Sequence, residues 1–311
     1  MSTSTATSRR RAAAGLAARE ISRTAGPSGW FAVPALLLFF AFALLPIVGV
    51  IALSFTSWNG LGAITFDGTA SWQKVLADPV TLNALVVTGK IMLFSFIVQA
   101  PISLLLGAFT AGLQKYRAIL AVLYFVPLLL SSAAVAIAFK ALLDPNFGLG
   151  PMSGIPLLQQ DFLGNPDLVL FVVIFVIAWQ FVPFHTLIYQ GGVKQIPKSL
   201  YEAAEIDGAN RVQQFFSVTL PQLKYTIITS STLMIVGSLT YFDLIFVLTA
   251  GGPGYSTRLL PLHMYLTGFR ANDMGAASAL GVILVLVGLV LAVVLQRFGG
   301  RDRSASQLDG A

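Results

Sequence analysis

Six long apolar runs alternate with shorter polar connections along this chain. Each run is near or above the roughly 18 to 20 residues that a helix needs to cross the apolar core of a bilayer. Lipid offers the backbone no hydrogen-bond partners, so each run is expected to be a helix and not an isolated strand. The predicted spans are 30–56, 84–111, 119–143, 168–190, 225–249 and 276–295. The pattern therefore predicts an all-α, polytopic membrane protein with six transmembrane helices.

The polar stretches between and beyond the runs divide the chain further. Residues 1–29 and 299–311 are polar tails, expected to be largely disordered on the cytoplasmic side, and 30–298 is the transmembrane domain. The connection 57–83 contains an amphipathic piece, 72–77, that can lie on the membrane surface. The connection 144–167 is built from turn-forming residues. Both connections are surfaces for docking or merely linkers.

Composition and charge sharpen this picture. Hydrophobic residues make up 56% of the chain and charged residues only 10%, against roughly 25% charged in an average soluble domain. Lysine and arginine set membrane orientation, because cytoplasmic connections carry an excess of them. Here they gather in both tails and in alternate connections, at Arg9, Arg10, Arg11, Arg19, Arg23, Lys115, Arg117, Lys194, Lys198, Arg211, Lys224, Arg297, Arg301 and Arg303. Both termini and the 194–224 loop are therefore expected to be cytoplasmic, and the net charge of +6 does not indicate nucleic-acid binding.

The chain offers little material for catalysis. It has no cysteine, which excludes disulfides, thiolate metal sites and cysteine nucleophiles. No glycine-rich phosphate loop ends in Lys-Ser or Lys-Thr, and its two histidines, His185 and His263, fall in different segments. A membrane-embedded enzyme would need several catalytic groups within reach of one another, and the sequence does not supply such a set. The chain is expected not to be an enzyme, to hold no metal and to bind no cofactor.

The loop between the fourth and fifth spans has the most informative polar pattern. Ser199 and Glu202 have the spacing of a capping box that starts a helix. Gly208 then interrupts the helix, which permits either a positive backbone φ or a close approach by another backbone. Asn210 is placed to cap a second short helix, and Leu220-Pro221 is expected to end the unit. Two short helices at an angle would carry one apolar ridge, which includes Ala203, Ala204, Ile206, Phe215, Phe216 and Val218, flanked by the carboxylates of Glu202, Glu205 and Asp207.

A few polar and aromatic residues fall inside the predicted spans. Asp243 lies beside Tyr241 and Phe242 toward the outer end of the fifth span. An intramembrane carboxylate indicates a functional site, and here it would accept hydrogen bonds from the hydroxyls of a polar solute while the ring of Tyr241 or Phe242 stacks on an apolar face of that solute. The alternative is that Asp243 is wet at the interface or caps the turn at Gly251-Gly252. Weaker candidates lie on the fourth span, at Trp179, Gln180, His185 and Tyr189, and on the second, at Gln99. For these five residues, interfacial anchoring or helix–helix hydrogen bonding is the favoured alternative.

The loop and the flanking motifs resemble a known family, the membrane-spanning permease subunits of binding-protein-dependent, ATP-driven (ABC) importers. The resemblance rests on Glu202-Ala203-Ala204, Asp207-Gly208-Ala209 and Leu220-Pro221. The run Phe242-Asp243, followed by 248–253 and Thr257, looks like the carbohydrate-uptake branch, the maltose and glycerol-phosphate kind, although Ala250 stands where glycine is common. The resemblance covers nearly the whole chain apart from the two tails.

The resemblance implies a function and a set of partners. The loop 194–224 would be a coupling helix that docks into a groove of an ATPase subunit through Glu202, Ala203, Ala204, Asp207, Gly208, Ala209, Phe215 and Pro221. A second permease subunit, two ATPase subunits that bind ATP and Mg, and an external sugar-binding protein facing Gly251, Gly252 and Pro253 are implied, in a bacterial or archaeal cytoplasmic membrane. A solvated helix face without a partner is the alternative for the loop. An ion-coupled secondary carrier of small polar solutes is the alternative for the chain, although such a carrier would be expected to place several ionisable groups at mid-membrane.

Overall fold

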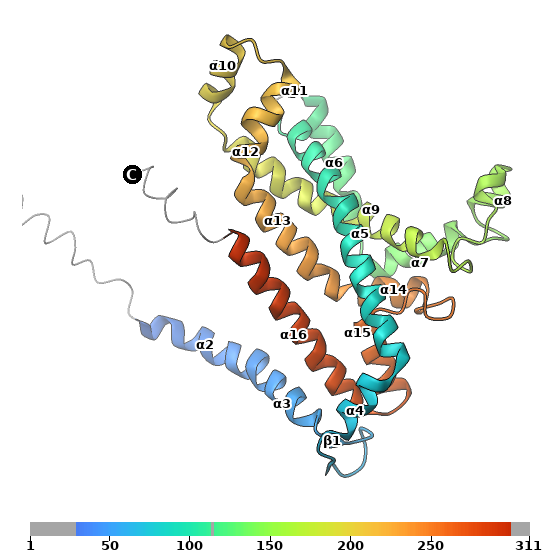
Figure 1. Cartoon of the computed structure of the whole chain (residues 1–311). Helices are drawn as coiled ribbons and strands as arrows, with labels where there is room; N and C mark the ends of the chain where they lie inside the picture. The colour runs from blue at the N-terminus through green and yellow to red at the C-terminus, as the bar shows by residue number, and fades with distance from the viewer. Residues whose placement is uncertain (1–28, 113–114, 300–311) are drawn as a thin grey trace, which may run out of the picture. The chain divides into compact units, whose positions relative to one another are not determined.

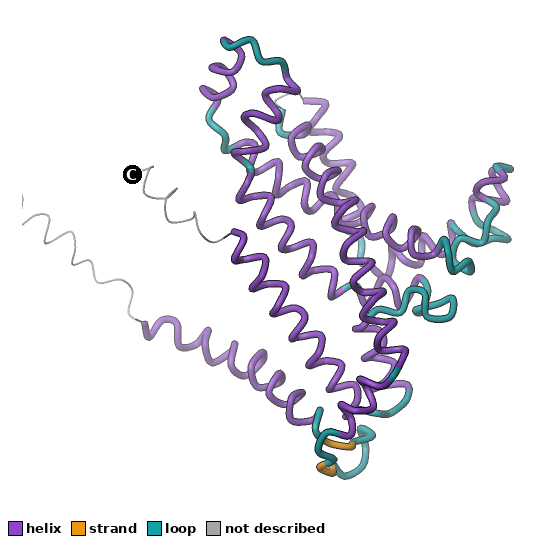
Figure 2. Tube along the Cα trace, in the orientation of Figure 1, coloured by secondary structure: helices purple, strands orange, loops and turns teal. Residues whose placement is uncertain are grey.

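The computed structural model describes residues 29–112 and 115–299, so most of each predicted polar tail lies outside the described residues. Helices dominate the described part, which confirms the all-α prediction (Figure 2). The strands found there are β1 (Thr56–Ser57) and β2 (Thr65–Phe66), which pair antiparallel in the 57–83 connection. The chain divides into two units, 1–49 and 50–311, which are described separately below.

The first predicted span is one apolar helix. It begins with a 3₁₀ turn at Gly29–Ala32, continues through α2 (Val33–Phe39) and a π-type turn at Phe40–Leu44, and ends with α3 (Leu45–Leu53). The stretch 30–53 contains no buried residue in its apolar window. A surface of this composition is suited to contact with lipid.

Two long helices, α5 (Pro79–Thr110) and α9 (Val169–Lys194), pack against each other in the second unit (Figure 1). Asp78 starts α5 by accepting a hydrogen bond from the Val80 amide at 2.9 Å. Near the other end of the pair, the Gln190 side chain donates to the Thr110 carbonyl at 2.9 Å. Close approach at this end depends on Gly107, because a Cβ there would lie 2.5 Å from Cβ of Tyr189. The extent of each apolar run predicted these helices, and α16 (Met274–Gly299), to within a few residues.

Two of the predicted spans are bent. The third consists of α6 (Lys115–Leu129) and α7 (Ser132–Leu142), with a bend of 95° between its apolar parts. The fifth consists of α13 (Lys224–Gly237), a 3₁₀ turn at Ser238–Thr240 and α14 (Phe242–Leu248), with a bend of 48°. The described residues thus hold four helices long and apolar enough to cross a membrane, or up to six if each bent pair is one span. The exact count of six stays a prediction.

Short helices occupy the connections. The amphipathic piece predicted at 72–77 is α4 (Ala70–Ala77), which buries Ser71 and Val75. The connection after α7 holds α8 (Leu149–Ser153) and a 3₁₀ turn at Pro156–Leu158. Between α14 and α16 lie α15 (Leu260–Tyr265) and a π-type turn at Leu266–Arg270.

The buried side chains form two apolar clusters. The larger one joins α5, α7, α9 and α14 and includes Ile91, Ile177 and Ile245, all fully buried. The smaller one joins α4, α15 and α16 through Val75, Leu260 and Leu280. The smaller cluster holds α4, α15 and α16 together at one end of the unit 50–311. The loop between α9 and α13 lies at the opposite end of α5 (Figure 1).

Candidate functional site: an exposed loop and a pocket at a helix bend

The loop between α9 and α13 consists of two short helices and a wide turn. The two helices are α10 (Lys198–Ile206) and α11 (Arg211–Gln214), and the wide turn is a π-type turn at Phe215–Thr219. A third helix of three residues, α12 (Leu220–Gln222), follows the turn and leads into α13. The hydroxyls of Tyr201 and Thr219 hydrogen-bond at 2.9 Å, which fastens α10 to the wide turn. The two-helix arrangement expected from the sequence is therefore present.

Gly208 ends α10 in a conformation that favours glycine. Its φ is +81°, its amide donates to the Glu205 carbonyl at 3.0 Å, and the next amide, of Ala209, donates to the Ala204 carbonyl at 2.9 Å. These two bonds form a Schellman motif, in which the residue after the helix is left-handed and the last carbonyls are satisfied. A Cβ at Gly208 would meet nothing within 4 Å. The sequence allowed two reasons for a glycine here, a positive φ or a close approach by another backbone, and the structure shows the positive φ.

Asn210 caps α11 as the sequence predicts. Its side-chain oxygen accepts from the amides of Val212 and Gln213, both at 3.0 Å, and the Gln213 side chain accepts from the Asn210 amide at 2.8 Å. This reciprocal pattern is a capping box that satisfies otherwise unpaired helix amides. Asn210 and Gly208 together fix the angle between α10 and α11.

Two local predictions for this loop are wrong. The residue before α10 is Pro197, and no side chain caps the helix, so Ser199 and Glu202 do not form a capping box. Proline pre-sets φ at the start of a helix without a side-chain hydrogen bond, which explains why none is needed. Leu220-Pro221 does not end the unit either, because Pro221 lies in the first turn of α12, where a missing amide proton is tolerated. The helical path continues into α13 through Leu223.

The outer surface of this loop carries an apolar ridge and carboxylates. Ile206, Val212 and Phe216 are 87%, 66% and 61% exposed. The three acidic residues, Glu202, Glu205 and Asp207, are exposed as well, as are Ala203 and Pro221, while Ala204, Ala209, Phe215 and Val218 are half-buried. Exposed apolar side chains rimmed by charge are typical of a protein interaction site. We refer to the exposed face of residues 202–216 as the coupling surface.

A second feature is a pocket of about 370 Å³ at the bend between α13 and α14. Tyr241, at the bend itself, and Asp243, in the first turn of α14, line it together with Phe181 and His185 of α9. The Phe181 and Tyr241 rings stack with centroids 5.2 Å apart and planes 28° apart. His185 is buried and its Nδ1 lies 3.0 Å from the Ser230 hydroxyl. The pocket therefore combines an exposed carboxylate with aromatic rings.

The other candidates for a substrate pathway lie outside the lining of this pocket. Phe242 stacks on Phe246 at 5.4 Å, and Trp179 packs edge-on against Phe139 at 5.2 Å. Gln180 Nε2 donates to the Leu130 carbonyl at 3.2 Å, which favours the structural alternative for that residue. Gln99 is fully buried, and the oxygen and nitrogen of its side-chain amide have no hydrogen-bond partner among the described residues.

The glycine-rich turn after α14 is held by threonines. The hydroxyls of Thr249 and Thr257 lie 2.7 Å apart, and Thr257 also donates to the Gly252 carbonyl at 2.8 Å. Asp243 forms no hydrogen bond to this turn within the described residues, so it does not cap it. Gly251 is buried with a φ of +88°, Gly252 and Pro253 are half-buried, and Gly254 is exposed. Ala250 has a φ of +52°, so it occupies a left-handed position that glycine adopts more easily.

Comparison with known proteins places these features in a family. Residues 101–303 match the model of the binding-protein-dependent transport system inner membrane component. A multiple sugar-binding transport system permease protein, MsmF, from Streptococcus mutans is 34% identical over 84% of this chain and 92% of its own length. An arabinooligosaccharides transport system permease protein, AraP, from Bacillus subtilis is 30% identical over 87% of each chain. A crystal structure of a bacterial ABC transporter involved in the import of the acidic polysaccharide alginate matches with a TM-score of 0.76 and 22% identity, over 90% of this chain and 97% of that chain.

The chain belongs to the family of binding-protein-dependent transport system inner membrane components. It is thus a multi-pass membrane permease, as the resemblance in its loop and spans indicates. The roles of individual residues in the loop and the pocket stay predictions.

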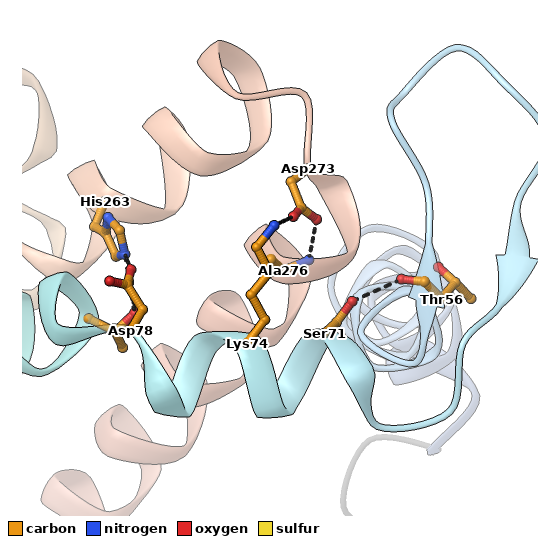
Figure 3. Close-up of polar contacts among 8 residues, drawn as sticks. Thr56, Ser71, Lys74, Asp78, His263, Asp273 and Ala276 are labelled. Carbon is orange, nitrogen blue, oxygen red and sulfur yellow. Dashed lines mark hydrogen bonds and ion pairs between the residues drawn. The ribbon is translucent and has the colours of Figure 1, made fainter.

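At the opposite end of α5 from the coupling surface, the permease has a polar cluster that sequence reasoning missed (Figure 3). Lys74 of α4 pairs with Asp273, and Asp273 accepts from the Ala276 amide at the start of α16. Asp78 lies 3.4 Å from Nε2 of His263 on α15. The partners are separated by up to 199 residues, so no local motif could reveal them. They join the ends of α4, α5, α15 and α16.

His263 in this cluster has an altered titration. Burial lowers its pKa below the usual 6.5, Asp78 raises it in part, and Arg258 lowers it.

No group of three or more His, Asp or Glu side chains suited to a metal ion occurs within residues 29–112 and 115–299.

Proposed function

We propose that this chain is one of two permease subunits of an ATP-driven sugar importer, forming half of the translocation pathway. The supporting observation is the coupling surface, a two-helix projection with exposed apolar side chains on a chain that belongs to the binding-protein-dependent transport family. Relatives named for transport of several sugars and of arabinooligosaccharides support the substrate class.

In this proposal the coupling surface docks into a groove of an ATPase subunit. Ile206, Val212 and Phe216 would supply apolar contact, and Glu202, Glu205 and Asp207 would pair with cations at the rim of the groove. Exposed ion pairs are each worth at most about 1 kcal/mol, so the apolar contact should carry most of the docking energy. The Schellman motif at Gly208 and the capping box at Asn210 keep the two helices at a fixed angle, which would transmit motion between subunits.

The pocket at the α13–α14 bend is the part of this chain best suited to a sugar. Asp243 would accept hydrogen bonds from hydroxyls, and the Phe181–Tyr241 stack presents aromatic surface to the apolar face of a sugar ring. Its volume of about 370 Å³ falls within the roughly 300–1,000 Å³ of small-molecule sites. A second permease would complete the pathway around it.

The remaining partners follow from the same proposal. ATP and Mg would bind to two separate ATPase subunits, and hydrolysis would occur there and not in this chain. An external sugar-binding protein would deliver the solute to the side of Gly251, Gly252 and Pro253. Both termini and the coupling surface would then be cytoplasmic, so that ATP-driven closure of the ATPase pair moves the helices between inward and outward openings. Family membership favours this importer over an ion-coupled carrier.

Replacing Gly208 with tryptophan tests the docking proposal. The space around Gly208 is open and its φ is +81°, so the substitution costs backbone strain of about 1–2 kcal/mol and places a large side chain on the coupling surface. We expect Gly208→Trp to be inserted normally in membranes and to reduce ATPase co-purification and solute uptake by at least about tenfold, which corresponds to a loss of about 1.4 kcal/mol in docking.

Gly154→Trp is the matched control. Gly154 also has a positive φ, of +67°, and open space around it, but it lies after α8, away from the coupling surface. The control should suffer the same backbone strain and keep both ATPase binding and uptake. Parent-level uptake and ATPase co-purification by Gly208→Trp would show that the ATPase docks elsewhere.

A further inference from the structure

Beneath the coupling surface, four cations surround a second pocket, of about 390 Å³. Arg117 lies at the start of α6, Lys194 at the end of α9, Lys198 at the start of α10 and Arg211 at the start of α11. We refer to it as the basic pocket. The four cations come from four different elements that the fold brings together. Neither the coupling motif nor the order of these residues in the sequence predicts that they lie around one pocket.

In the part of the chain that the structure describes, no carboxylate neutralises the positive charge of the basic pocket. No aspartate or glutamate lines it, and within residues 29–112 and 115–299 none of its four cations forms an ion pair with a carboxylate. Arg117 is instead held by neutral groups, with a hydrogen bond to the Phe109 carbonyl at 2.7 Å and its guanidinium 4.5 Å from the centre of the Phe109 ring. Gathering four like charges without a counter-ion is unfavourable, so the pocket is suited to an anion.

The rest of the lining is mostly apolar. Ala108 and Ala111 at the end of α5, Val193 and Ile196 at the end of α9, and Phe215 of the wide turn contribute to it. Elsewhere on its surface α6 carries exposed apolar side chains, with Ile119 and Leu123 each 63% exposed. Cations beside apolar surface, at the level where spanning helices end, match an amphiphile whose head is anionic and whose tails lie along α6.

We propose that the basic pocket binds the phosphate headgroup of an anionic phospholipid. Arg117 and Arg211 can each offer two N–H donors to phosphate oxygens, while Lys194 and Lys198 supply point charges at the rim. The apolar lining favours a lipid over a free phosphate ion, which would gain nothing from Val193, Ile196 and Phe215. Because the pocket lies between the membrane-spanning helices and the coupling surface, a bound lipid would support α10 and α11 from below.

Lipid titration of the purified full-length chain tests this inference. The midpoint of thermal unfolding in detergent would be followed against short-chain phosphatidylglycerol, phosphatidylcholine and sodium phosphate. Phosphatidylglycerol should raise the midpoint at lower concentration than the other two. The double variant Lys194→Gln, Arg211→Gln should need about 30-fold more of it, about fivefold for each cation removed.

Two further variants make the result specific. Lys140→Gln, Arg270→Gln removes two exposed cations that do not line the basic pocket and should titrate like the parent. Lys194→Gln, Lys198→Gln replaces two exposed side chains and serves if the first double variant fails to fold. An equal response to phosphatidylcholine, an equal response to sodium phosphate, or an equal loss in the control variant would each overturn the proposal.

The test is independent of ATPase docking, because lipid binding is read on the chain alone. ATPase co-purification measured on Lys194→Gln, Lys198→Gln, whose two residues lie outside the coupling surface, separates the two ideas. Weaker lipid binding with normal co-purification supports the lipid site. Normal lipid binding with lost co-purification would show that these cations face the ATPase, and would overturn the lipid proposal while leaving the coupling proposal intact.

Discussion

Tyr241 and Asp243 show how the position of a residue relative to a helix break decides what it can contact. Tyr241 has a φ of −72° and a ψ of +49°, which interrupts the helix, and Asp243 follows in the first turn of α14. A carboxylate is favoured in the first turn by the exposed helix amides. The break turns both side chains toward the same pocket, while Phe242 between them packs on Phe246 and Tyr265.

Asp243→Asn should impair transport without affecting assembly. The change keeps the shape of the side chain but removes its charge, and a hydrogen bond to a charged group is worth about 1.5–3 kcal/mol. Uptake kcat/KM in vesicles should therefore fall about tenfold to 100-fold, with normal ATPase co-purification. Asp67→Asn, at an exposed carboxylate of the 57–83 connection, is the control and should behave like the parent. Unchanged uptake by Asp243→Asn would remove this residue from the pathway.

His263 should make stability depend on pH. Its pKa is lowered in the folded chain, so the unfolded chain binds more protons as the pH falls below about 6.5. Stability is therefore greatest above that value and decreases on acidification toward the lowered folded-state pKa. Thermal unfolding in detergent at about pH 8 and about pH 5.5 should show a larger decrease for the parent than for His263→Gln. The same decrease in both would assign the effect to other groups.

Among the elements, α5 and α9 lie in close contact where Gly107 faces Tyr189. Gly107→Ala would place a Cβ 2.5 Å from the Tyr189 Cβ and 3.1 Å from the Gln190 amide nitrogen, and the backbone cannot yield cheaply there. We expect a destabilisation of about 1–3 kcal/mol, measured as a lower midpoint of thermal unfolding.

Gly89→Ala is the matched control on the same helix. Its Cβ would meet nothing within 4 Å, so the substitution should be neutral or should stabilise by up to about 1 kcal/mol. If both substitutions changed the midpoint of thermal unfolding equally, α5 and α9 would not be in tight contact at Gly107 in the membrane.

The extent of most spanning helices could be predicted from the sequence, because the thickness of the bilayer sets the length of an apolar run. The bends could not be, since Leu130-Ser131 and Tyr241 lie inside continuous apolar runs. Ser131 does cap α7, with its hydroxyl accepting from the Ala134 amide at 3.2 Å, and that was a usable signal. In the loop, Gly208 and Asn210 could be predicted because their roles are local. The contribution of His185 to the pocket depends on which helices are neighbours, and one sequence does not reveal that.

For the whole molecule, the docking proposal depends on which side of the membrane each end of α5 faces. The chain has no cysteine, so Glu205→Cys and Tyr255→Cys each introduce a single thiol at an exposed position on an opposite side. In right-side-out vesicles, a membrane-impermeant maleimide should label Tyr255→Cys at once and Glu205→Cys only after permeabilisation. The reverse pattern would place the coupling surface outside and refute docking to a cytoplasmic ATPase.

The corner between α6 and α7 has a consequence for biosynthesis. The Leu130 carbonyl there accepts its hydrogen bond from Gln180, which is 50 residues further along the chain and is translated later. A carbonyl without a partner is costly in lipid, so the corner is expected to be less stable in the membrane before α9 has been made. Insertion of α6 and α7 is therefore expected to be completed only after the ribosome has passed Gln180, which makes this part of the permease a late step in its assembly.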